Sequence, residues 1–96
     1  EGGIVQATSW ALKESVLFAG TTVQAETWLD YPILRFSEIP RVFIDVIDRP
    51  DLPPLGCGEV SQAPTVAAIG NAVRDAFGVR VRKLPITRHA IIEAAS

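Results

Sequence analysis

A single carboxylate on a glycine-containing loop is the feature of this sequence best suited to chemistry. Glu59 follows two glycines, Gly56 and Gly58. Glycines allow backbone conformations closed to other residues and let a ligand approach closely. Pro64, five residues later, suits the first turn of a helix, where its missing N–H costs nothing. Glu59 should therefore project from a tight turn near a helix N-terminus, a place where sites are often built. Taken alone, these residues favour a carboxylate that caps the helix over a catalytic one.

The other residue types that do chemistry are scarce. The chain has one cysteine, Cys57, and one histidine, His89. A thiol nucleophile needs a positioned base, so we interpret Cys57 as a small buried residue and His89 as a structural or surface residue. One cysteine and one histidine cannot build the usual zinc site, and no metal ligands are predicted. A single cysteine also excludes an intrachain disulfide.

Length and composition indicate one small globular domain or part of a larger one. The 96 residues are 48% hydrophobic and 21% charged, with a net charge of −2. This charge argues against nucleic acid as a partner. A local basic cluster is interpreted as a solvated or partner-facing strand edge; its members are Arg80, Arg82, Lys83 and Arg88. The chain begins with Glu1 and contains no methionine, so we expect it to be a piece of a longer protein.

The first predicted helix runs from Ile4 to about Glu14. Its apolar residues recur at a period near 3.6 and so fall on one face. Gln6 and Ser9 fall on the opposite face, where we expect them to meet solvent.

Two more helices are predicted in the second half of the chain. Pro64–Phe77 carries an apolar stripe, and Gly78 is a natural C-terminal cap. Thr87 can cap a last helix, in which Ile91 and Ile92 should face inward.

Strands are predicted between these helices. Val16–Phe18 and Thr22–Trp28 flank a turn and suggest a β-hairpin. Arg41–Ile47 is apolar on both faces, so we expect a strand that is covered on both sides, and Val79–Lys83 reads as a short strand. The predicted fold class is α+β, in the order helix, β-hairpin, strand, helix, strand, helix.

Six pieces of the sequence, taken in order, resemble one known family. The pieces are Glu1-Gly2-Gly3-Ile4-Val5-Gln6 with Ser9-Trp10-Ala11-Leu12-Lys13-Glu14, Asp30-Tyr31-Pro32-Ile33-Leu34-Arg35 with Ser37-Glu38-Ile39-Pro40, Gly56-x-Gly58-Glu59, Pro64, Ala68-Ile69-x-Asn71-Ala72, and Gly78-x-Arg80-x-Arg82-x-Leu84-Pro85-Ile86. Together they resemble the C-terminal end of the molybdopterin-binding subunit of the molybdenum hydroxylases, the xanthine oxidase and aldehyde oxidase family. Within it, the isoquinoline 1-oxidoreductase beta-subunit type is the most similar.

The resemblance implies roles for the loop residues. Residues 1–96 would form the C-terminal part of a large molybdopterin-binding domain and not a complete functional domain. Glu59 would be the general base in the hydroxylation of an aldehyde or N-heterocyclic aromatic, with water as the oxygen source. Gly56 and Gly58 would shape the loop beside the cofactor.

The resemblance also implies cofactors and partners. The longer protein would bind molybdenum as molybdopterin, in the cytosine dinucleotide form, and a small separate subunit would carry iron–sulfur clusters. The isolated piece should hold no cofactor, be inactive, and self-associate through uncovered apolar surface. The alternative is a small α+β interaction or binding module without catalysis, in which the glycine-containing loop is only a turn.

Overall fold

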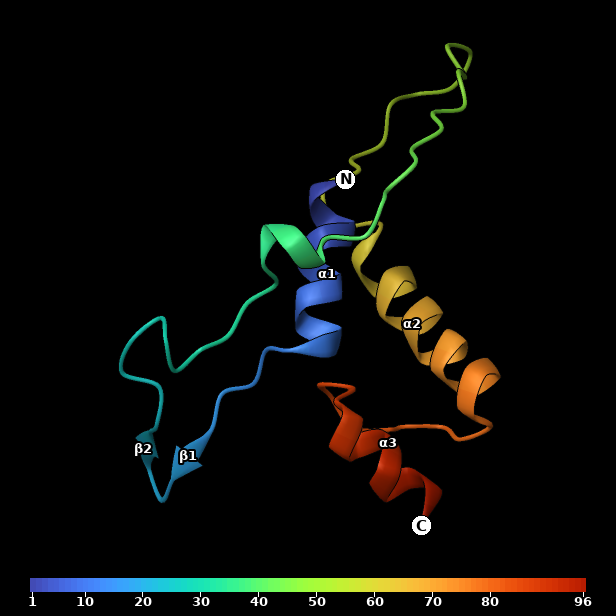
Figure 1. Cartoon of the computed structure of the whole chain (residues 1–96). Coiled ribbons are helices and arrows are strands. Elements are labelled where there is room, and N and C mark those ends of the chain that lie inside the picture. Colours follow the sequence, from blue (N-terminus) through green and yellow to red (C-terminus); the bar gives the residue numbers. More distant parts are fainter.

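The computed structural model describes residues 1–96 and contains three α-helices, one 3₁₀ turn and one two-stranded hairpin (Figure 1). The elements in chain order are α1 Gly2–Leu12, β1 Phe18–Ala19, β2 Thr22–Val23, η1 Phe36–Glu38, α2 Gln62–Phe77 and α3 Arg88–Ala95. The predicted α+β class is confirmed. None of the helices has the length and apolar character that crossing a bilayer would require.

Helices α1 and α2 are the two helices that pack against each other. In Figure 1 they start near a common end and diverge along their length. Helix α2 begins at Gln62, so Pro64 is its third residue and not its first. It ends at Phe77 because Gly78 turns into the left-handed region at φ 73°, as predicted.

Helix α3 begins where its cap predicts. The Thr87 Oγ1 accepts a hydrogen bond of 3.1 Å from the Ala90 backbone N–H. Ile91 is half-buried, but Ile92 is 54% exposed, so the prediction that both face inward is wrong for Ile92. The buried residue of this helix is Ala90.

The predicted hairpin is present but short. Phe18 pairs with Val23 and Ala19 with Thr22 in antiparallel register, and Gly20 makes the turn at φ 63°. Each strand has two residues, and all four are exposed.

The other two predicted strands are wrong. Arg41–Ile47 and Val79–Lys83 form no regular element. In the first of these, Phe43 on one face of the alternation is 88% exposed and Val46 on the other is 80% exposed, so neither face is fully covered. A strand needs a neighbour that takes up its backbone N–H and C=O groups, and this chain offers none to either segment.

The buried core is very small and lies around α1. Six of the 96 residues are buried: Ala7, Thr8, Ser9, Ala11, Ile86 and Ala90. The accessible surface is 7954 Å², whereas a compact protein of this mass would expose about 5,400 Å². The radius of gyration is 16.5 Å, against about 12.5 Å for a compact chain of this length. The fold therefore leaves about 2,500 Å² more surface open than a complete domain would.

Hydrogen bonds join two segments that are distant in the sequence, around Leu34 and Ile86, to α1. The Leu34 N–H donates to Ser9 Oγ at 2.9 Å, and the Ile86 N–H donates to the Ala11 carbonyl at 2.6 Å. Ser9 is thus buried, and its predicted solvent position is wrong. A small hydroxyl is tolerated on a buried helix face because it is hydrogen-bonded there.

Candidate functional site

Glu59 lies in the turn that leads into α2. Its carbonyl accepts a hydrogen bond of 3.1 Å from the Gln62 N–H, which closes the turn directly before the helix. The side chain is exposed and has no hydrogen-bond or ion-pair partner in the chain. Ser61 occupies the N-cap position of α2, and no side chain caps the helix there. The interpretation of Glu59 as a capping residue is therefore wrong, and its carboxylate is available to a group outside this chain.

The two glycines before Glu59 are open but not strained. Positive φ values occur at Gly20 and Gly78, and not at Gly56 or Gly58. Gly56 and Gly58 therefore do not use the left-handed conformations that glycine allows. A Cβ added at either position would meet no heavy atom within 4 Å, so the space beside the loop is empty in this chain. Their proximity to a cofactor stays a prediction.

The close approach near Glu59 involves a different glycine, which the sequence reasoning missed. A Cβ placed on Gly3 of α1 would lie 2.5 Å from Ser61 Oγ and 3.5 Å from the Gly58 carbonyl oxygen. Helix α1 therefore lies against the turn on both sides of Glu59. The sequence reasoning missed it because the predicted helix began at Ile4, whereas α1 begins at Gly2 and so contains Gly3.

A side-chain hydrogen bond joins α1 to the first residue of α2, one turn further along α1 than Gly3. Gln62 Nε2 donates a hydrogen bond of 3.0 Å to Gln6 Oε1. Gln6 is exposed, as its helical position predicts, but the amide pair across 56 residues is visible only in the folded chain.

The structure brings no metal-ligand cluster together. No group of three or more His, Cys, Asp or Glu side chains could hold a metal ion. Cys57 is exposed, so its predicted burial is wrong, and His89 lies on the exposed surface of α3. The basic cluster is exposed, and within it Arg80 Nη1 donates to Asn71 Oδ1 at 3.3 Å.

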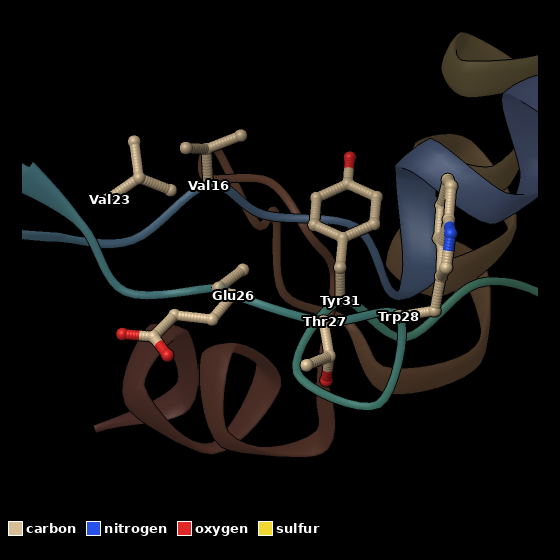
Figure 2. Close-up of a pocket in the computed structure, with 7 residues that line it drawn as sticks. Val16, Val23, Glu26, Thr27, Trp28 and Tyr31 are labelled. Atoms are coloured by element: carbon tan, nitrogen blue, oxygen red, sulfur yellow. The ribbon is translucent and has the colours of Figure 1, made fainter.

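A hollow of about 380 Å³ beside the hairpin has the wrong character for a polar ligand site (Figure 2). Val16, Val23 and Tyr31 point to one side in Figure 2, and Thr27 points to the other. The Tyr31 hydroxyl already donates to Glu14 Oε2 at 2.9 Å. A ligand pocket needs a few convergent polar groups, and this lining lacks them. Neither this hollow nor the three others on the surface is lined by any residue of the loop 56–59.

The shifted pKa values belong to structural pairs within residues 13–51, all before the loop that carries Glu59. Lys13 Nζ donates a hydrogen bond of 2.5 Å to Glu38 Oε1. This hydrogen bond is the largest cause that lowers the pKa of the Glu38 carboxyl. The hydroxyl of Thr27 similarly lowers the pKa of Asp30. These pairs hold η1 and the turn at residues 27–30 before it in place and have no evident chemical role.

Three curated relatives match almost the whole chain. It is 44% identical over 90 residues, 94% of its length, to one of the subunits of nicotinate dehydrogenase from Pseudomonas putida. It is 35% identical over 86 residues, 90% of its length, to the beta subunit of isoquinoline 1-oxidoreductase from Brevundimonas diminuta. It is 31% identical over 98 residues, 98% of its length, to one of the subunits of a probable xanthine dehydrogenase from Bacillus subtilis. Protein-family models and solved structures give no match.

The matches cover 8%, 11% and 13% of the length of these three relatives. The relatives are bacterial oxidoreductases. They are members of the molybdenum hydroxylase family, and the chain is homologous to one segment of them. The resemblance drawn from the sequence motifs is thereby confirmed.

Proposed function

We propose that this chain is part of the molybdopterin-binding subunit of a molybdenum hydroxylase, in which Glu59 is the general base. The intact protein would hydroxylate an electron-poor carbon of an N-heterocycle or aldehyde, with water as the oxygen source. The similarity to two proteins named for the N-heterocycles nicotinate and isoquinoline favours an N-heterocycle. The observation that carries the proposal is the exposed, unpartnered carboxylate of Glu59 in a chain whose homologues are such enzymes.

The residues of this chain fit a segment that supplies a base and not metal ligands. The chain holds no cluster of three or more metal-ligating side chains, so in this proposal the residues that hold the cofactor lie mainly in the rest of the protein. The open space beside Gly56 and Gly58 leaves room for a large group to approach the loop. When bound, molybdopterin with its molybdenum would supply the redox chemistry. A cytosine dinucleotide form and iron–sulfur clusters on a small partner subunit complete the proposed enzyme.

Glu59 is suited to the transfer of a proton. A general base must come within about 2.6–3.2 Å of the proton it removes, directly or through one water. Both carboxylate oxygens of Glu59 are free of partners in this chain, so both can accept. The Gln62 N–H holds the Glu59 carbonyl, which fixes the backbone from which the side chain extends.

We further propose that residues 1–96 are the C-terminal part of a larger domain whose remainder covers the open apolar surface. The excess of about 2,500 Å² exceeds the roughly 800 Å² that each partner buries in a standard interface. Large uncovered apolar patches drive association. The isolated chain should therefore be inactive and should self-associate, and light scattering that reports a clean monomer would contradict this.

The proposed role of Glu59 is tested by Glu59→Gln in the intact protein. The amide keeps the size of the side chain but cannot accept a proton at neutral pH. We expect turnover of N-heterocycles to fall about 10²–10⁴-fold, the usual contribution of general acid–base catalysis. Molybdenum and pterin contents should be unchanged. Glu93→Gln, an exposed carboxylate on α3 without a side-chain partner, is the matched control and should keep full turnover.

Two results would reject the proposal. Undiminished turnover in Glu59→Gln would show that Glu59 is not the general base. The absence of molybdenum and pterin from well-folded intact protein would show that the protein is not a molybdenum hydroxylase and would favour an interaction module.

A further inference from the structure

Helix α1 contacts the Glu59 turn through a position that has no side chain. The Cβ that alanine would add at Gly3 would lie 2.5 Å from Ser61 Oγ, closer than such atoms approach in proteins, so either the Ser61 side chain must rotate away or the turn must shift. The same Cβ would be 3.5 Å from the Gly58 carbonyl oxygen, an ordinary contact. Gly58 and Ser61 flank Glu59 in the sequence, so the backbone of α1 supports the turn on both sides of the carboxylate.

A chain of hydrogen bonds leads from α1 to the backbone of Glu59. Gln6 Oε1 accepts from Gln62 Nε2 at 3.0 Å, and the Gln62 backbone N–H donates to the Glu59 carbonyl at 3.1 Å. Gln6 is three residues after Gly3 and therefore lies on the same side of α1. Both contacts of α1 thus converge on the first residues of α2 and the turn before them.

We propose that Gly3 and Gln6 are positioning residues that hold the Glu59 carboxylate in its working place. The inference rests on the proposed function of Glu59 as a base. The Glu59 side chain has no partner of its own in the chain, so its location is set through the backbone of the turn. A displacement of about 1 Å in a catalytic group can reduce the rate about 10²-fold.

Gly3→Ala in the intact protein is the first test, with Gly2→Ala as the matched control. Both changes add one methyl group to the first turn of α1, but a Cβ on Gly2 meets nothing within 4 Å. We expect Gly3→Ala to lower kcat at least about tenfold with KM and molybdenum content unchanged, and Gly2→Ala to preserve kcat. The added change Ser61→Ala removes the Oγ that the new methyl meets, so Gly3→Ala combined with Ser61→Ala should recover most of the lost kcat.

Hydrogen exchange provides a readout that does not depend on catalysis. The amides of residues 56–62 should exchange faster in Gly3→Ala and Gln6→Ala than in the unchanged protein. Gln24→Ala should leave them unaltered, because Gln24 is exposed and its side chain makes no hydrogen bond. Gln6→Ala and Gln62→Ala should have non-additive effects on exchange and on kcat, since each removes the same hydrogen bond.

The outcomes separate this inference from the proposed function. If Glu59→Gln abolishes turnover while Gly3→Ala matches Gly2→Ala in kcat and exchange, the base stands and the positioning role is overturned. If Glu59→Gln retains turnover, the positioning role in catalysis also falls, whatever the exchange shows. If Gly3→Ala does not fold and Ser61→Ala fails to rescue it, the contact with Ser61 is not the reason and the inference is overturned.

Discussion

Phe43 provides a direct measure of whether the open surface is covered in the intact protein. Its side chain is 88% exposed in the chain alone. An aromatic residue buries about 150 Å² or more when enclosed, so about 130 Å² of Phe43 is available to a covering segment. At about 25 cal/mol per Å², its burial would contribute about 3 kcal/mol. A cavity left by truncation would add to this, and Phe→Ala changes in protein cores cost about 3–5 kcal/mol.

Phe43→Ala should therefore act very differently in the two contexts. In the isolated chain, the change should leave helix content by circular dichroism unaltered, because Phe43 lies outside every helix and is largely exposed. In the intact protein, it should lower the apparent melting temperature by several degrees, as expected for a loss of about 3 kcal/mol or more. Ser37→Ala, also exposed and without a side-chain hydrogen bond, is the control and should change stability by about 0.5 kcal/mol at most.

One result would refute this reasoning. If Phe43→Ala and Ser37→Ala gave the same melting temperature in the intact protein, Phe43 would be exposed there too. The remainder of the larger domain would then not cover the segment 41–47, and the estimate of about 2,500 Å² of covered surface would be wrong.

Two further predictions concern local contacts. Thr87→Ala removes the acceptor of the Ala90 N–H and should destabilise α3 by about 1 kcal/mol, seen as faster amide exchange at Ala90, whereas Thr87→Ser should not; equal exchange in both variants would contradict the cap. The pKa of Glu38 is lowered chiefly by Lys13 and then by the Arg35 N–H, so this contact stabilises the fold above the ordinary glutamate pKa and is lost as the pH falls through the lowered value. Lys13→Met should raise the Glu38 pKa in a carboxyl titration by NMR, and an unchanged titration would show that the ion pair does not form in solution.

Local sequence signals predicted the parts of the fold that depend on neighbouring residues. The αL position of Gly78 and the cap at Thr87 were both foreseen, because each follows from the chemistry of one residue and the backbone within four positions of it. The hairpin was foreseen for the same reason, although its strands are shorter than predicted. The turn residue Gly20 fixes the reversal, while strand length depends on neighbours that the chain lacks.

The predictions that were wrong depended on which segments and groups of the folded chain lie next to one another. The segment 41–47 has the apolar residues on both faces of a covered strand, but this pattern describes only what a strand would bury and not whether a neighbour exists to pair with it. Ser9 was assigned to solvent from its helical position, yet Leu34 supplies a donor that makes its burial acceptable. The capping role of Glu59 failed because N-cap geometry is set by the turn conformation, which placed Ser61 there.

The sequence alone predicted the three helices, the C-terminal end of α2, the cap of α3 and the resemblance to the family, because these depend on residue types within a few positions and on motifs in a fixed order. The predicted starts at Ile4 and Pro64 were each two residues late. Only the tertiary structure decided which residues meet around Glu59. The approach of Gly3 to Ser61 and the bond between Gln6 and Gln62 join positions more than 50 residues apart. Such contacts arise from the way two helices pack in space, and no local pattern in the chain encodes that packing.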